Sequence, residues 1–147
     1  MTSMPYRELS RALFACAVFC LAGTASAQTL SADAARGLAD YRAQCAKCHG
    51  PAGKGDGRLM DMQNRRLPDL TRLSARNNGS FPAARVAEII DGTKVIVIHG
   101  RPGMPVWGKP MRDEAARQCA ASGCDPEAVV SARIRALAAA IESFQVK

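Results

Sequence analysis

Residues 37–49 read GLADYRAQCAKCH, and the last five letters of this stretch decide how the rest of the chain is interpreted. They place two cysteines, Cys45 and Cys48, on one short turn, with His49 directly after the second. A bare Cys-x-x-Cys pair occurs in disulfide oxidoreductases, in zinc sites and as a structural disulfide. The adjacent histidine favours another chemistry. In Cys-x-x-Cys-His the two thiols add across the vinyl groups of a haem, and the imidazole becomes a ligand of its iron.

Zinc and thioredoxin-like chemistry fit the remaining residues poorly. A zinc site needs two further ligands at matching spacing, and the candidates, His99, Cys119 and Cys124, follow no zinc pattern. A thioredoxin-like pair would follow a strand of a βαβ unit, and no such strand is predicted before Cys45. We therefore predict one covalently bound haem c. Both cysteines of the motif attach it, and His49 is a ligand of its iron.

A helix is predicted to carry this motif at its end. Ser31 fits an N-cap. The residues that follow recur at steps of four, three and four, as expected for one face of an amphipathic helix: Ala34, Leu38, Tyr41 and Cys45. On this helix Gly37 leaves room for a second helix to approach closely, and Tyr41 fills the space beside it.

The spacing Gly-x3-Tyr-x3-Cys-x2-Cys-His resembles the first helix of class I cytochromes c. The likeness continues in the glycine-rich loop 50–57 and in Pro68-Asp69-Leu70-Thr71, which resembles the Pro-x-Leu element of that family. In the family the carbonyl oxygen of this proline accepts the Nδ1 proton of the haem histidine and so orients its ring. The resemblance therefore implies that Pro68 serves His49. The same proline also suits the start of a helix, and the two roles are compatible.

Residues 103–108, GMPVWG, resemble the loop that supplies a methionine ligand in the same family. The resemblance implies that Met104 is the sixth ligand of the iron and that Trp107 covers an edge of the haem. A thioether is a soft, neutral donor that favours ferrous iron and raises the reduction potential. Only Met104 lies between a glycine and a proline, unlike the other methionines beyond residue 27: Met60, Met62 and Met111.

His99 is the competing sixth ligand. Ligation by two histidines would lower the reduction potential and suit a different partner. However, His99 follows the apolar stretch Val95–Ile98 and precedes Gly100. It is therefore expected to end a buried segment or to form a local hydrogen bond.

The remaining patterns complete an all-α fold of the class I cytochrome c type, with helices packed around one haem. Short helices are predicted over Thr71–Asn77 and Pro82–Ile90. Apolar residues in and beside the second of these are expected to line the haem crevice: Phe81, Val86, Ile89 and Ile90.

A final helix is predicted from its cap Asp125 onward. Its apolar residues recur at helical spacing: Val130, Ile134, Leu137, Ile141 and Phe144. It resembles the C-terminal helix that crosses the first helix at Gly37 and Tyr41 in the family. The chain departs from the family where Ala140 stands, because an aromatic residue is usual there, and this leaves the register of the crossing open.

Residues 109–124 have no counterpart in the family pattern. They separate the methionine loop from the final helix and contain Cys119-Ala-Ala-Ser-Gly-Cys124. Four intervening residues with a glycine can close into a disulfide loop. We expect a structural disulfide here, and the alternative is a redox-active or partner-facing pair of thiols.

The first 27 residues are predicted to be a cleavable secretory signal peptide. Arg7 and Arg11 form a basic start, and the apolar run 12–23 is too short to span a bilayer permanently. Ala25-Ser26-Ala27 supplies small residues for cleavage after Ala27, so the cytochrome domain would comprise 28–147 and lie in the periplasm. The alternative is an uncleaved anchor. No later apolar stretch is long enough to span a membrane, so stable insertion of the mature chain is not expected.

The charge of the chain bears on its partners. The net charge is +7, and removal of the predicted signal would leave a basic chain. The cations form no runs and aromatic residues are scarce, which argues against nucleic acid as a partner. A basic face that docks redox proteins with an acidic surface is expected, and a generally soluble surface is the alternative.

Electron transfer is the predicted function. With both axial positions of the iron filled, no open site remains for substrate turnover, so an electron carrier rather than an enzyme is expected. One alternative is an electron-transfer subunit of a periplasmic dehydrogenase complex. The other is a haem sensor or enzyme in which Met104 dissociates from the iron.

Overall fold

The structure, a computed structural model, describes residues 31–62, 67–98 and 101–146. In chain order its helical elements are α2 (Ala32–Asp40), the π-helical turn η1 (Tyr41–Cys45), α3 (Ala46–His49), α4 (Arg58–Asp61), the 3₁₀ turns η2 (Leu70–Arg72) and η3 (Ala75–Asn77), α5 (Ala83–Asp91), α6 (Gly108–Ser122) and α7 (Pro126–Ser143). The predicted all-α fold is confirmed. Within the described residues the strands are the two-residue β1 (Val97–Ile98) and β2 (Arg101–Pro102), which pair antiparallel. The predictions for residues 1–27 and His99 fall outside the described ranges.

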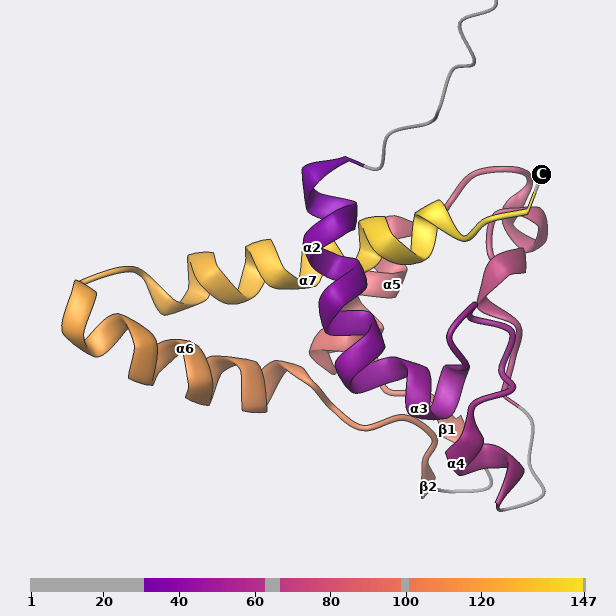
Figure 1. The fold of residues 1–147 in the computed structure, drawn as a ribbon, viewed down its shortest axis with the longest axis horizontal. Helices are drawn as coiled ribbons and strands as arrows, with labels where there is room; N and C mark the ends of the chain where they lie inside the picture. The colour runs from indigo at the N-terminus through magenta and orange to yellow at the C-terminus, as the bar shows by residue number, and fades with distance from the viewer. Residues whose placement is uncertain (1–30, 63–66, 99–100, 147) are drawn as a thin grey trace, which may run out of the picture.

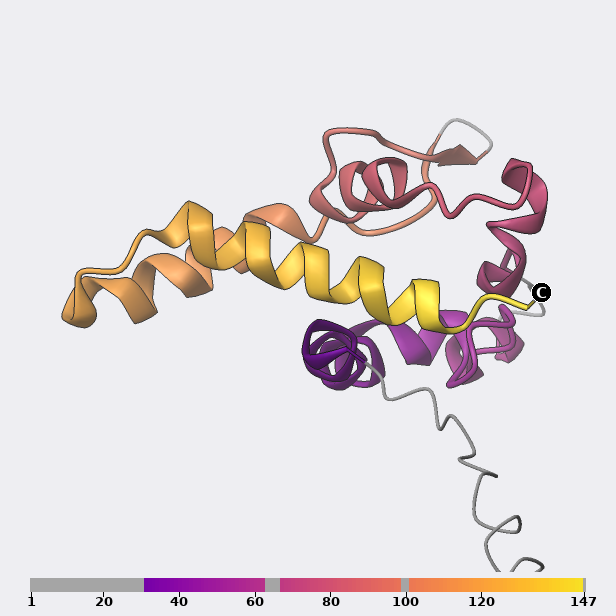
Figure 2. The same cartoon turned by 90° about the horizontal axis from the view of Figure 1, so that it is seen from above.

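Helix α7 is the centre of the fold. Figure 1 shows α2 crossing it, and Figure 2 shows α2 and α5 on opposite sides of it. Because α7 packs against α2, α5 and α6, most of the buried side chains gather along it. The core cluster comprises Tyr41, Val86, Ile90, Met111, Ala115, Val130, Ile134, Leu137, Ala138 and Ile141.

The crossing of α2 and α7 depends on Gly37, as the sequence predicts. A Cβ atom added to Gly37 would lie 1.8 Å from the carbonyl oxygen of Ala136 and 2.7 Å from the backbone nitrogen of Leu137. Helix backbones therefore touch at this point, and a side chain here would push them apart. This fixes the register that the sequence leaves open.

Aromatic packing beside the crossing comes from a different residue than the family pattern suggests. Tyr41 is fully buried, and its ring meets the ring of Phe144 edge to face at a centroid distance of 4.9 Å. Ala140 is also fully buried, so its small side chain fits a tightly packed position. The aromatic partner of Tyr41 thus stands four residues later, at the C-cap of α7.

The predicted helix boundaries are largely confirmed where capping side chains mark them. The Ser31 hydroxyl accepts the N–H of Ala34 at 3.1 Å, and the Asp125 carboxylate accepts the N–H of Glu127 at 3.0 Å. The helix predicted over Thr71–Asn77 is replaced by the turns η2 and η3.

The residues predicted to line the haem crevice divide between two environments. Val86 and Ile90 belong to the core cluster with α7, and Phe81 packs against its edge. None of the four residues lines the cleft described below. For Val86 and Ile90 the cause is simple: their spacing of four residues puts both on the face of α5 that α7 covers.

Helix α6 forms an antiparallel pair with the first half of α7 that projects from the rest of the molecule (Figure 1). No helix was predicted here from sequence.

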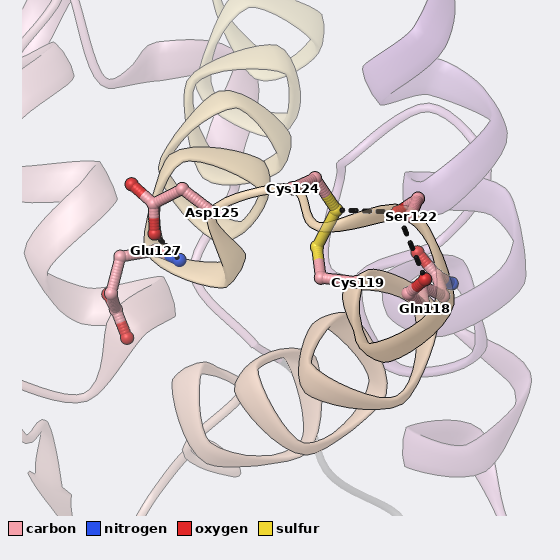
Figure 3. The surroundings of a disulfide bond; sticks show 6 residues. All are labelled: Gln118, Cys119, Ser122, Cys124, Asp125 and Glu127. Atoms are coloured by element: carbon pink, nitrogen blue, oxygen red, sulfur yellow. Dashed lines mark hydrogen bonds between the residues drawn. A yellow bond between two sulfur atoms is a disulfide. The ribbon is translucent and has the colours of Figure 1, made fainter.

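The predicted disulfide is confirmed, since Cys119 and Cys124 are bonded and tie the end of α6 to the start of α7 (Figure 3). Closing so short a loop contributes about 2 kcal/mol in the chain-entropy model. Arg133 of α7 adds ion pairs to Asp40 of α2 at 2.7 Å and to Glu114 of α6 at 2.6 Å.

Candidate functional site

The Cys-x-x-Cys-His motif lies on a break in helical geometry. The N–H of Ala46 bonds to the carbonyl oxygen of Tyr41, which widens the last turn of the first helix into the π-helical η1. Such turns are frequent at functional sites because they redirect the side chains that follow. The short helix α3 then carries Cys48 and His49 and ends at Gly50, whose φ of 79° disfavours a side chain.

The glycine-rich loop folds back onto the motif and holds it in place. The N–H of Gly57 donates to the carbonyl oxygen of Cys48 at 3.1 Å, and that of Gly55 donates to the carbonyl oxygen of His49 at 2.9 Å. A Cβ atom on Gly57 would lie 2.3 Å from the Cys48 backbone, so this approach requires glycine. The buried Tyr41 hydroxyl donates to the carbonyl oxygen of Gly50 at 2.8 Å. The turn that presents the cysteines is thus fixed from both sides.

A cleft of about 180 Å³ opens where this turn faces the segment after β2. Its walls combine two segments far apart in sequence with one residue of α4. The lining residues are Gln44, Cys45, Lys47, Cys48, His49, Leu59, Met104, Pro105 and Trp107. The fold therefore brings the two predicted axial ligands and both predicted attachment cysteines to one cleft.

Burial shapes the chemistry of the motif. Both cysteines are free thiols, and burial, with smaller effects of Asp40 and Cys48, raises the pKa of Cys45 to about 11. Burial also lowers the pKa of His49, so its imidazole is neutral at neutral pH and has a lone pair to offer a metal.

The Nδ1 atom of His49 is buried, and no described residue forms a hydrogen bond with it. The predicted bond to the carbonyl oxygen of Pro68 is therefore not formed in this structure. Two backbone bonds nevertheless bring that proline toward the motif, because Gly55 bonds to His49 and the N–H of Leu67 donates to Gly55 at 3.2 Å. The role of Pro68, whose side chain is exposed, stays a prediction.

The cleft fits a covalently held haem. It offers two thiols on one turn, a neutral imidazole with an orphaned buried nitrogen, and a thioether from the second segment that lines it. Thiols for attachment and nitrogen and sulfur donors for the iron are the donor set of a c-type haem with histidine and methionine ligands.

Some cleft residues were not predicted from sequence. Gln44, Lys47 and Pro105 are next to predicted site residues in the sequence. That adjacency is the signal from which they could have been predicted to line the cleft. Leu59 gives no such signal, because it reaches the cleft only through the fold of the glycine-rich loop. Trp107 lines the cleft and is half-buried, and its role in covering an edge of the haem stays a prediction.

Comparison with known proteins identifies the family. Residues 32–121 match the family model described as cytochrome C oxidase, cbb3-type, subunit III. No curated protein and no solved structure matches the chain. Of the helices in the described residues, none is long and apolar enough to cross a membrane. Because the match covers more than half of the chain and includes both walls of the cleft, the chain belongs to this family and is a class I c-type cytochrome with covalently bound haem c.

Proposed function

We propose that this protein is a periplasmic one-electron carrier whose haem iron is held by His49 and Met104. The observation that carries the proposal is that these two side chains line the same cleft as Cys45 and Cys48. The periplasmic location rests on the predicted signal peptide in residues 1–27.

Each side chain has a separate task in this function. The sulfur atoms of Cys45 and Cys48 would hold the haem covalently, and the neutral imidazole of His49 would donate to its iron. The thioether of Met104 would complete the coordination from the opposite wall, and Trp107 would shield that side from water. When bound, the haem supplies an iron that cycles between ferric and ferrous states.

The first test uses the unmodified protein. We expect one covalent haem per chain, a potentiometric titration with a one-electron slope, and the weak near-infrared charge-transfer band of methionine-ligated ferric haem. Ferrous protein should bind carbon monoxide only slowly, because Met104 occupies the sixth position. Rapid carbon monoxide binding would instead support the sensor or enzyme alternative.

The docking surface of the carrier is proposed to be basic. Lys47 lines the cleft and is exposed, and Arg42 and Arg58 are exposed on the adjoining elements η1 and α4. Among the acidic side chains that the structure describes, which do not include Asp61, none forms an ion pair with Lys47 or Arg42. A partner with an acidic surface would be attracted to the cleft, where electrons enter and leave.

Charge removal tests this surface. At low ionic strength Lys47→Gln is expected to slow oxidation of the ferrous protein by the anion ferricyanide about threefold, because the local positive potential falls. The control Arg117→Gln removes the same charge from exposed α6 and should leave the rate within about twofold of wild type. In roughly 1 M salt the difference should vanish, since charges are then screened within about 3 Å. Equal rates for both variants at low salt would refute a docking role for Lys47.

A further inference from the structure

Residues 92–107, the loop that contains Met104, connect the end of α5 to the start of α6, and these two helix ends lie close together. The N–H of Trp107 donates to the carbonyl oxygen of Ile90 at 3.1 Å. One residue further on, a Cβ atom added to Gly108 would lie 2.3 Å from the carbonyl oxygen of Asp91. The two ends of the segment therefore meet, as they do in an Ω-loop.

Two further contacts restrain the residues on either side of Met104. The N–H of Gly103 donates to the carbonyl oxygen of Ile96 at 2.7 Å. Gly92 ends α5 with a φ of 90°, and a Cβ atom there would lie 2.2 Å from a methyl carbon of Val106. Met104 thus sits on a short run of chain that is restrained on either side, and its position depends on how α5 and α6 are held together.

A guanidinium group closes the junction of α5 and α6. Arg112, just beyond the first turn of α6, places Nη1 2.8 Å from Oδ1 of Asp91 at the end of α5. Its Nε donates to Oε1 of Glu127, in the first turn of α7, at 2.9 Å. These three residues, Asp91, Arg112 and Glu127, form what we call the Arg112 clasp.

Among the ion pairs of the described residues, Arg112 is the partner of Asp91. The side chain of Asp91 is only 16% exposed, and its buried Oδ1 makes no hydrogen bond of good geometry, so Arg112 is its counter-charge. Removing the guanidinium would leave a carboxylate oxygen buried without compensation, which is strongly unfavourable. A groove of about 250 Å³ is lined by Asp91, Arg112 and Glu127 and also by Arg135, so solvent and a second guanidinium lie close to the clasp and moderate the effect.

We propose that Arg112 is a positioning residue for the sixth ligand. Its ion pair with Asp91 holds the two ends of the loop together. This contact would therefore set the free energy needed to displace Met104 from the iron. The inference rests on the proposed ligand Met104. Arg112 acts through the loop rather than by lining the cleft.

The test measures the hold of the sixth ligand directly. Imidazole binds the ferric iron only by displacing the resident ligand, so its affinity reports that hold. We expect Arg112→Gln to raise imidazole affinity about tenfold, equivalent to about 1.4 kcal/mol, and to weaken the near-infrared band. The matched control is Lys109→Gln, which breaks an exposed ion pair to Asp113 within α6 and joins no second element. It should stay within about twofold of wild type.

Each outcome decides the proposal. A folded Arg112→Gln protein whose imidazole affinity and near-infrared band match wild type would overturn it, even if its melting temperature fell. If Arg112→Gln does not fold, Glu127→Gln removes only the exposed arm of the clasp and should raise the affinity about threefold. An unchanged affinity in that variant would equally overturn the proposal. Absence of the near-infrared band from wild type would instead refute Met104 as a ligand, which is a separate failure.

Discussion

Met104→Ala is expected to keep its haem while losing the properties that methionine ligation confers. The two thioether bonds from Cys45 and Cys48 do not depend on the opposite wall of the cleft, so covalent haem should remain. The near-infrared band should disappear, and ferrous protein should bind carbon monoxide readily. The reduction potential should fall by about 0.1–0.3 V, within the roughly 0.8 V span that axial ligands control, because the soft donor that favours ferrous iron is gone.

Two controls make this result specific. Met62 is 77% exposed at the end of α4, and Met62→Ala should change neither the band nor the potential. His99→Ala should likewise leave both unchanged. If His99→Ala abolished the wild-type sixth ligation while Met104→Ala had no effect, the iron would be held by two histidines, and a low potential would be expected.

The parts of the fold that could be predicted from sequence are those set by local rules. The Cys-x-x-Cys-His motif is a local constraint, and the caps Ser31 and Asp125 bond within a few residues of themselves. Gly37 was predictable as a point of close approach because a glycine on the apolar face of a helix contributes nothing else to packing. The site residues Cys45, Cys48 and His49 could also be predicted, because the motif that contains them is itself a local pattern.

Helix α6 shows where local rules give too little signal. Its buried side consists of few and mostly small residues, so no broad apolar stripe marks it. A narrow one exists, since the buried side chains Met111, Ala115 and Cys119 recur every four residues. Such a stripe suits a helix that packs mainly along one neighbour, α7, and touches α5 only at its start.

Apart from the α2–α7 crossing, which the family resemblance implied, contacts between distant elements could not be predicted. Asp91 and Arg112 meet only because the segment between them closes on itself, and nothing in either sequence neighbourhood indicates the partner. The cleft residue Leu59 is similar. It depends on the bond between Gly57 and Cys48, which turns α4 toward the motif.

The double substitution Cys45→Ser and Cys48→Ser is expected to have the largest effect on the whole molecule. Without the two sulfur atoms no covalent haem can form, and a denaturing gel stained for haem should show none. We also expect loss of roughly half or more of the far-UV helical signal, because a small domain buries a modest core and the haem contributes much of it.

The matched control removes the other two cysteines. Cys119→Ser with Cys124→Ser deletes the same number of sulfur atoms but opens only the disulfide at the far end of the α6–α7 pair (Figure 3). That protein should retain stained haem and the wild-type spectrum, and lose about 2 kcal/mol of unfolding free energy. Haem staining retained by the Cys45 and Cys48 double variant would refute the attachment site. A variant that is well folded but contains no haem would agree with the assigned attachment site. It would also show that the α2–α7 crossing, rather than the haem, stabilises the fold.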